Sequence, residues 1–170
     1  DDVVITTMNV GHGSCHIIQS AGQTVIIDAG SRSDLDTGTR TIIPKLRNSG
    51  TTTIKTIFIT HADLDHLVGI IDIIQQYKTE KIVIAPQTLK NTTPLLELII
   101  EVARKCGTQI KSGSAGWTEV VGEMRFAILS PDNRAPYYSS NATSIVLHLQ
   151  ANTRSILFTG DIDETRIAQL

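Results

Sequence analysis

The chain has 170 residues, enough for one domain with a substantial hydrophobic core, and we expect residues 1–170 to form a single domain. Hydrophobic residues make up 41% and charged residues 19% of the sequence, which is typical of a folded globular protein and excludes a disordered chain. The net charge of −2 and the aromatic content of 4% do not indicate a dedicated nucleic-acid-binding module, which usually has a basic excess and aromatic platforms.

Two cysteines, Cys15 and Cys106, are too few for a disulfide framework and are not spaced as a zinc-binding pair. No apolar run reaches the roughly 18 residues that a transmembrane helix needs, and no basic-then-apolar leader opens the sequence. We therefore expect no membrane segment and a cytoplasmic location, although a trimmed N-terminus at Asp1 would be compatible with export. The sequence leaves the oligomeric state open.

The first third of the sequence is typical of short β-strands. Apolar and β-branched residues gather at positions 3–5, 15–19 and 24–27, separated by turns that contain glycine. Because these strands follow one another closely, we expect an antiparallel meander. Strand–helix units are expected next, over these ranges: helix 39–48, strand 54–60, a helix with Asp65 as N-cap that ends at Tyr77, strand 81–85 and helix 95–105.

The last third of the sequence again favours strands. A meander, then strand–helix units, then further strands predicts an α/β sandwich with mixed sheets rather than a doubly wound parallel sheet. Loops are expected at 112–116 and 131–140, where glycine, proline and serine are frequent. The expected strands are 109–110, 119–121, 125–129, 144–149 and 155–158, followed by a helical stretch at 163–170.

Four candidate metal ligands lie within the six residues His61-Ala62-Asp63-Leu64-Asp65-His66, directly after an apolar strand and before a helix. In an extended chain His61 and Asp63 point the same way, whereas Asp65 and His66 turn towards the start of the helix. This spacing suits two metals that share one water. Helix capping is the alternative for a single Asp or His here, but four such residues together favour a metal site.

These residues resemble the motifs of the metallo-β-lactamase superfamily. That superfamily has His-x-His-x-Asp-His at a strand-to-helix junction, an earlier Asp after a β-hairpin and a later Gly-Asp after a strand. The matching positions here are Asp28, His61 to His66, and Asp161 after Gly160. The resemblance implies an αβ/βα sandwich with two mixed β-sheets and a hydrolase that uses a metal-bound hydroxide.

The resemblance also implies roles for individual residues. Two divalent metal ions, zinc or manganese, would be held by five side chains, and Asp161 would bridge the two ions. Asp65 and Asp161 would be the catalytic carboxylates, and Asp28 would orient ligands without touching the metal. The five implied ligands are His61, Asp63, Asp65, His66 and Asp161.

Within the superfamily, the variant His-x-Asp-x-Asp-His resembles the soluble hydrolase domain of competence-type DNA-uptake channels (the ComEC family) and its stand-alone relatives. Three further stretches are similar to that group: the turn at 9–14, the helix at 43–47 with Gly50 behind it, and the Asn-x-x-Ser strand at 141–147. The resemblance covers most of the chain and is weak from about residue 86 to 117. It implies DNA or another phosphodiester as the substrate.

The sequence also departs from the superfamily pattern. Asp63 in place of a histidine makes the site richer in oxygen, which shifts the metal preference from zinc towards manganese. No histidine stands at the third motif, where Asn141 is the nearest candidate ligand and is equally compatible with a turn. His12, in a glycine-flanked turn, is a possible substrate contact. The superfamily's last strand and helix normally follow the Gly-Asp motif, so we expect this chain to be C-terminally incomplete.

Three functions are compatible with this sequence. A two-metal phosphodiesterase or nuclease is favoured by Asp63 and by the resemblance to DNA-uptake proteins. Hydrolysis of a small ester, lactone or thioester is favoured by the near-neutral charge. A non-enzymatic binding module is favoured by the missing histidine ligands.

Overall fold

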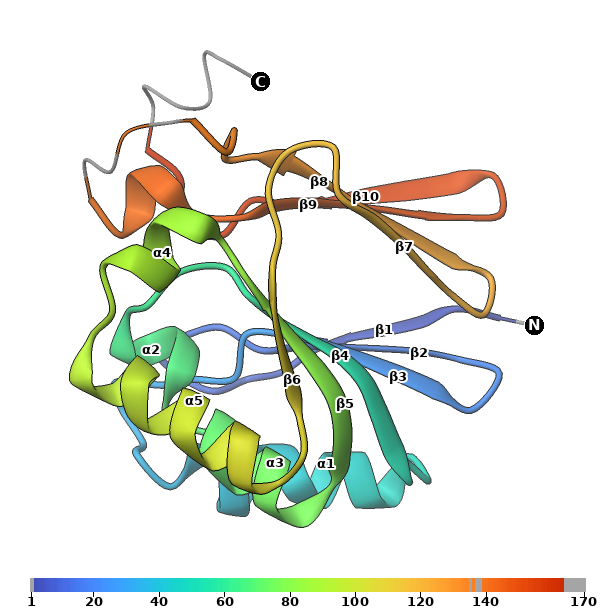
Figure 1. Ribbon diagram of the computed structural model, residues 1–170. Helices are drawn as coiled ribbons and strands as arrows, with labels where there is room; N and C mark the ends of the chain where they lie inside the picture. Colours follow the sequence, from blue (N-terminus) through green and yellow to red (C-terminus); the bar gives the residue numbers. More distant parts are fainter. Residues whose placement is uncertain (1, 135, 137–138, 164–170) are drawn as a thin grey trace.

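Two β-sheets lie face to face in the computed structural model, and helices cover the outer face of the larger sheet (Figure 1). The structure describes residues 2–134, 136 and 139–163. The larger sheet has the strand order β1-β2-β3-β4-β5-β6, and its strands are β1 (Val4–Thr7), β2 (His16–Ser20), β3 (Gln23–Ile27), β4 (Thr53–Ile59), β5 (Lys78–Ile84) and β6 (Gln109–Ser112). The smaller sheet has the order β10-β9-β8-β7, and its strands are β7 (Thr118–Val121), β8 (Met124–Ser130), β9 (Val146–Ala151) and β10 (Arg154–Phe158).

The larger sheet is mixed, as the sequence predicts. Strands β1, β2 and β3 pair antiparallel and form the expected meander. From β3 to β6 the pairs are parallel, because helices carry the chain back across the sheet between consecutive strands. The carboxyl ends of β3 and β4 therefore lie side by side at one edge, which brings Asp28 next to the segment that starts at Thr60.

The smaller sheet differs from the expected mixed sheet, because all its pairs in the described part of the chain are antiparallel. Two of its connections are two-residue hairpin turns. Gly122 has φ +59 in the turn between β7 and β8, and Asn152 has φ +53 in the turn between β9 and β10. Such turns reverse the chain directly and allow only antiparallel neighbours. The expectation of two mixed sheets is therefore wrong for this sheet.

The helical segments differ in detail from the expected ones. The expected helix 39–48 is a π-helical turn, η1 (Gly38–Ile42), followed by α1 (Ile43–Asn48), and Pro44 lies in the first turn of α1 as expected. The expected helix 95–105 is α5 (Pro94–Lys105), where Thr93 Oγ1 accepts the N-cap hydrogen bond from Leu96 N. The sequence did not indicate α4 (Pro86–Lys90) or the 3-10 turn η2 (Asn141–Thr143).

The expected helix from Asp65 to Tyr77 is two helices, α2 (Leu64–Leu67) and α3 (Ile70–Gln76). Asp63 is the N-cap of α2 and Asp65 lies inside its first turn, so the prediction that Asp65 caps the helix is wrong. The break falls at Gly69, whose N donates to Ala29 O at 2.7 Å. A Cβ at Gly69 would lie 2.9 Å from that oxygen, so only glycine permits this close approach.

Two separate hydrophobic clusters fill the molecule. One lies between the larger sheet and helices α1, α3 and α5, with Ile57, Ile73 and Ile99 fully buried in it. The other lies between the two sheets, where Phe58 packs 5.5 Å from Phe126, centroid to centroid. Strands β2, β3, β4 and β5 thus place buried apolar residues on both faces of the larger sheet, as their apolar runs indicate.

The described residues contain no helix long and apolar enough to cross a membrane. The expected helical stretch at 163–170 lies almost entirely outside the described residues. The expectations of a C-terminally incomplete chain, a single domain and a cytoplasmic location stay predictions.

Candidate metal centre

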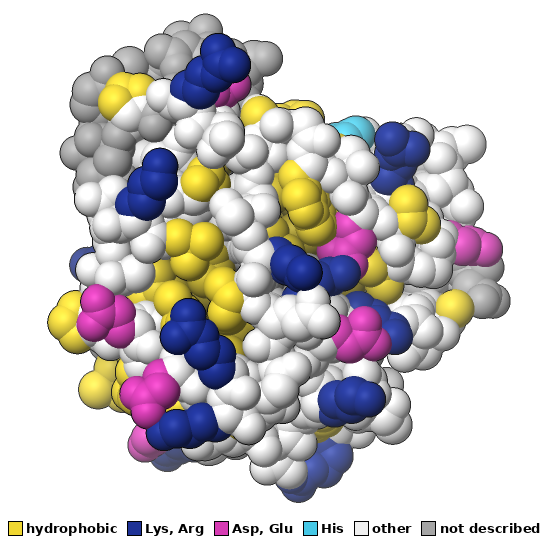
Figure 2. All heavy atoms as spheres, in the orientation of Figure 1, with side chains coloured by type: hydrophobic (Ala, Val, Ile, Leu, Met, Phe, Trp, Pro, Cys, Tyr) yellow, Lys and Arg dark blue, Asp and Glu magenta, His cyan; other side chains and the backbone are white. Residues whose placement is uncertain are grey.

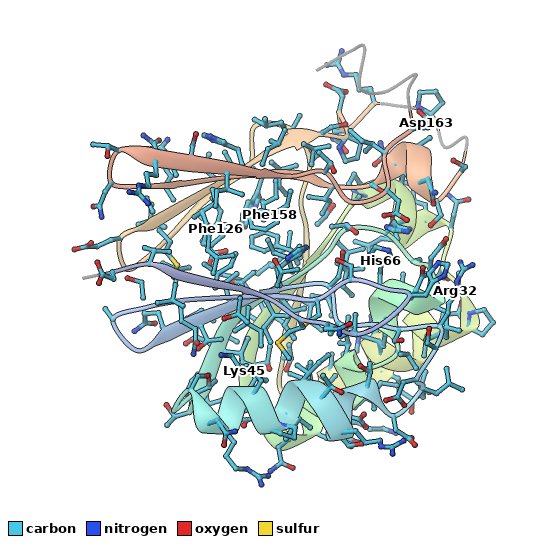
Figure 3. The ribbon with its side chains drawn as sticks, turned by 180° about the vertical axis from the view of Figure 1, so that it is seen from behind. Arg32, Lys45, His66, Phe126, Phe158 and Asp163 are labelled. Carbon is cyan, nitrogen blue, oxygen red and sulfur yellow. The ribbon has the colours of Figure 1, made fainter. Side chains whose placement is uncertain are left out.

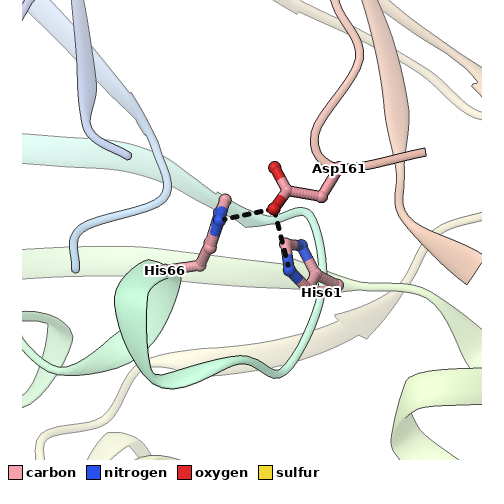
Figure 4. A group of neighbouring side chains, drawn as sticks. All are labelled: His61, His66 and Asp161. Carbon is pink, nitrogen blue, oxygen red and sulfur yellow. Dashed lines mark ion pairs between the residues drawn. The ribbon is translucent and has the colours of Figure 1, made fainter. Parts of the chain in front are cut away.

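Three side chains converge where the two sheets meet at one end of the molecule. His61 and His66 come from the segment between β4 and α2, and Asp161 follows β10 (Figure 4). Asp161 Oδ2 lies 3.6 Å from His66 Nε2 and 4.0 Å from His61 Nε2. The ligand atoms of the three residues lie within 4.8 Å of one another, which is the spacing of a candidate metal-binding group. Both imidazoles are buried, whereas the Asp161 side chain is 48% exposed.

Asp28 and Thr60 orient the two imidazoles. Asp28 Oδ1 accepts a hydrogen bond from Thr60 N, and Asp28 Oδ2 accepts one from Thr60 Oγ1, both at 2.8 Å. His66 Nδ1 donates to Asp28 Oδ2 at 2.8 Å. Since the only hydroxyl proton of Thr60 goes to Asp28, its oxygen accepts from His61 Nδ1 at 3.0 Å. Both Nδ1 atoms are thereby protonated, and both Nε2 atoms face the cluster.

The protonation of His61 suits metal binding, whereas His66 is held in the opposite direction by nearby carboxylates. Burial, and then the neighbouring His66, lower the pKa of His61 and favour its neutral form. His61 Nε2 is buried and has no hydrogen-bond partner. A buried nitrogen without a hydrogen-bond partner destabilises a folded protein, and coordination of a metal ion would remove that penalty. Burial also disfavours charge on His66, but the hydrogen bond and charge of Asp28, with Asp161 and Asp65, raise the pKa of His66.

Two glycines hold the start of α2 in place. Ser14 N donates to Asp65 O and Ala29 N donates to His66 O. The loops after β1 and β3 therefore fix this segment by backbone hydrogen bonds. A Cβ at Gly13 would lie 2.7 Å from Asp65 O, and one at Gly30 would lie 2.3 Å from Asp65 C. No side chain fits between these backbones, which explains the glycines at positions 13 and 30.

The carboxylates of Asp63 and Asp65 lie beside the cluster and share a cation. Asp63 Oδ2 is 3.8 Å from His61 Nε2 and 3.7 Å from Arg32 Nη2. The buried carboxylate of Asp65 accepts a hydrogen bond from Arg32 Nε at 3.1 Å, and His12 Nε2 lies 3.6 Å from its other oxygen. Figure 3 shows Arg32 and His66 at the same end of the molecule.

The structure thus brings together most of the residues that the sequence singled out. His61, His66 and Asp161 form the cluster, Asp63 adjoins it, and Asp28 lies behind His66. Asp65 faces Arg32 and His12 instead. Sequence reasoning missed Thr60 and Arg32. Thr60 could have been found, because it directly precedes the motif, whereas nothing near Arg32 in the sequence marks its pairing with a residue 33 positions away.

Asn141 is the first residue of η2, and its backbone carbonyl accepts a hydrogen bond from Ser144 N. This arrangement is that of a turn residue. The adjacent Ser140 contacts the motif, since Ser140 Oγ accepts a hydrogen bond from Ala62 N at 3.3 Å. Ligation by Asn141, and contact between His12 and a substrate, stay predictions.

A cavity of about 340 Å³ opens beside the cluster, in the size range of small-molecule sites. Its walls include Asp28, His66 and Asp161, together with the rings of His16 and Phe158, whose centroids are 5.0 Å apart. Two larger hollows, of about 460 and 470 Å³, lie elsewhere and are lined by no histidine. Of these three cavities, the smaller one is therefore the one that adjoins the candidate metal cluster.

The model of the metallo-β-lactamase superfamily matches residues 8–168. The chain belongs to this superfamily. Members typically bind divalent metals and share a hydrolase fold, which agrees with the two sheets and with the ligand-like cluster described above. Superfamily membership supports metal-dependent hydrolysis in general.

Comparisons with individual proteins agree with this assignment. The chain is 28% identical over 127 residues to ComE operon protein 3 of Bacillus subtilis (strain 168), which covers 75% of this chain and 16% of that protein. The chain thus spans a small part of the length of this relative. YhfI of Bacillus subtilis, a metallo-β-lactamase fold protein, has a similar structure with a TM-score of 0.63 and 14% identity, over 99% of this chain and 68% of that one. Zn²⁺-bound PqqB of Methylobacterium extorquens has a TM-score of 0.57 and 13% identity, over 85% and 47%.

Proposed function

We propose that this chain is a metal-dependent phosphodiesterase or nuclease. The observation that carries the proposal is the set of carboxylates around two pre-oriented imidazoles. Asp63 and Asp161 both lie within 4.0 Å of His61 Nε2, so the site is rich in oxygen donors. Such a donor set suits manganese as well as zinc. The resemblance of the motif to DNA-uptake hydrolase domains supports a phosphodiester as the substrate.

The group of His61, His66 and Asp161 has the spacing of one metal site. In this proposal Asp63, together with Asp65 once its carboxylate is released from Arg32, would supply the further ligands for a second divalent ion. When bound, such ions act as Lewis acids on a phosphoryl oxygen and lower the pKa of water.

The chain itself orients the two imidazoles and gives the cavity an apolar side. Asp28 holds the proton of His66 at Nδ1, and Thr60 holds that of His61 at Nδ1, so both lone pairs face the cluster. Phe158 and Leu157 form the apolar side of the cavity and exclude water from one flank of the bound substrate. Asp161 contributes a half-exposed carboxylate at the open side, where substrate enters.

The test is cleavage of end-labelled single- and double-stranded DNA by the full chain with Mn²⁺ or Zn²⁺. We expect cleavage that EDTA abolishes and that falls at least about 100-fold in His61→Ala and Asp161→Ala. Asp36→Asn, on the exposed surface before η1, is the matched control and should cleave like the wild type. Absence of cleavage with both metals would refute the proposal.

Hydrolysis of a small ester is the second candidate, and the surface charge favours it. Lys and Arg are interspersed with Asp and Glu on the face in Figure 2, and no broad basic surface is seen on that face. Turnover of a lactone or thioester without binding or cleavage of DNA would select this function. Retention of two tightly bound ions per chain would argue against a non-enzymatic binding module.

A further inference from the structure

The guanidinium of Arg32 lies where two candidate ligand carboxylates come together. Its Nε donates to Asp65 Oδ1 at 3.1 Å, and its Nη2 lies 3.7 Å from Asp63 Oδ2. The Asp65 side chain is 7% exposed, so its charge needs a partner inside the protein. The Arg32 side chain is 52% exposed, so the guanidinium can reach solvent without crossing the core.

The backbone of Arg32 is fixed even though its side chain is long and half exposed. Arg32 N donates to His12 O at 2.7 Å. The preceding residue, the fully buried Ser31, holds the loop together, because its Oγ donates to Val10 O and accepts from Ser33 N and Asp34 N. The loop therefore presents a cation at a defined point beside the metal cluster.

We propose that Arg32 is a phosphoryl-binding residue whose availability depends on metal loading. In the metal-free chain its guanidinium neutralises Asp63 and Asp65. If Asp63 and Asp65 held divalent ions, Arg32 would lose both partners and its guanidinium would be free to pair with a new anion. Its planar fork of N–H groups matches two phosphoryl oxygens, which a lysine ammonium does not. The inference rests on the proposed function, in which the substrate is a phosphodiester.

Two binding measurements test this inference without any turnover. Calorimetric titration of the Mn²⁺-loaded full chain with inorganic phosphate should give a Kd about tenfold or more weaker for Arg32→Gln than for the wild type, as expected for the loss of a charged hydrogen bond. Titration of the metal-free chain with Mn²⁺ should give about fivefold or more tighter binding in Arg32→Gln, because the competing cation is gone. The matched control Arg40→Gln, in η1, should change neither value.

Equal phosphate affinity in the wild type and Arg32→Gln would overturn the inference, and so would unchanged or weaker Mn²⁺ binding. Arg32→Lys keeps the charge and is the control for misfolding of the Arg32→Gln variant. It should bind Mn²⁺ like the wild type and phosphate about as weakly as Arg32→Gln, since the fork is lost; full phosphate affinity in Arg32→Lys would refute the role of the fork. Loss of phosphate binding in Arg32→Gln, together with no DNA cleavage by the wild type, would refute only the proposed nuclease.

Discussion

Asp28 occupies a backbone conformation that few residues accept. Its φ is +55, in the left-handed region where Asp and Asn are enriched. This conformation turns the carboxylate back towards the end of β4, where Thr60 and His66 donate to it. The carboxylate is 1% exposed, so these hydrogen bonds stabilise its charge in place of water. Asp28 is thus the residue that sets the orientation of His66.

Asp28→Asn should weaken metal binding about 10- to 100-fold, the usual effect of losing a carboxylate behind a ligating histidine. Asparagine keeps the backbone conformation and the acceptor for Thr60 N, so the fold should persist. Competition with a chromophoric chelator measures the affinity, and Asp36→Asn serves as the control. Wild-type affinity in Asp28→Asn would show that the hydrogen bond at 2.8 Å does not tune His66.

The sequence predicts these residues only where a short motif contains them. His61, His66 and Asp161 carry side chains that have few other uses at the end of a strand, so their types and order indicate the cluster. The carboxylate with which a cationic side chain pairs is harder to predict from the sequence. Asp65 looks like a ligand in the motif, yet in the structure it binds Arg32 from a loop 33 residues earlier. Such pairing depends on tertiary structure that no local pattern encodes.

At the scale of elements, the junction between β4 and α2 depends on backbones that nearly touch. Gly30→Ala would place a Cβ 2.4 Å from His66 N and 2.3 Å from Asp65 C. We expect a loss of about 3 kcal/mol in the free energy of unfolding, at the upper end for overpacking, together with loss of metal binding. Urea unfolding and metal titration measure the two effects.

Gly50→Ala is the control for that variant. Gly50 has φ +73 and open space around it, so alanine there should cost about 1–2 kcal/mol of backbone strain and leave metal affinity intact. Equal metal affinity in Gly30→Ala and Gly50→Ala would show that the close approach does not position the ligands.

The contact between α3 and η1 contains an unfavourable charge. Burial, and then the Asp36 carboxylate, raise the pKa of Asp72 above its ordinary value of 3.8, although the Thr39 N–H opposes this. The folded chain therefore binds this proton more tightly than the unfolded chain, and stability falls as the pH rises from about 3.8 through the folded-state pKa. Above that window the whole penalty is present.

Asp72→Asn should therefore stabilise the chain at neutral pH, by only about 0.5 kcal/mol, because solvent still screens the charge of this partly exposed group. At about pH 3, where the carboxyl is protonated in both states, the gain should disappear. Urea unfolding at the two pH values checks this, with the acidic measurement as the control. An equal gain at both values would assign the effect to packing of the amide rather than to charge.

Most strands could be predicted because their apolar runs are continuous, as in β4 and β5, and the observed bounds agree to within three residues. The division of the expected helix 65–77 could not be predicted. It depends on the approach of Gly69 to Ala29, which are 40 positions apart in the sequence. The second sheet is antiparallel instead of mixed, because two-residue turns at 122–123 and 152–153 form hairpins. Neither turn has the Asn-Gly or Asp-Gly pair that marks such a hairpin in a sequence.

At the scale of the whole molecule, the candidate ligands come from both layers. His61 and His66 follow β4 of the larger sheet, and Asp161 follows β10 of the smaller one. A backbone hydrogen bond near the site, from Ile145 N to Thr60 O at 2.8 Å, also joins the layers. A bound ion would add a further link between the sheets at the same end.

Metal should therefore stabilise the molecule as a whole. At a free Mn²⁺ concentration of about 100 times Kd the gain is about 2.7 kcal/mol, or roughly 5–11 °C in Tm for a chain of this size. Differential scanning calorimetry with and without EDTA measures it. Asp161→Ala should leave the metal-free Tm within about 2 °C, since the side chain is half exposed, and remove most of the metal-dependent rise. A full rise in that variant would exclude Asp161 as a ligand.

The two hydrophobic clusters divide the molecule into parts that can change independently. The cluster beneath the larger sheet includes Ala62 and Leu67, each next to one of the buried histidines, whereas residues 113–117 connect the larger sheet to β7 of the smaller one. Insertions or substitutions at 113–117 would leave the packing around α1, α3 and α5 untouched. A lineage built on this framework could therefore vary this connection while it keeps the histidines that follow the larger sheet and the Asp161 that follows the smaller one.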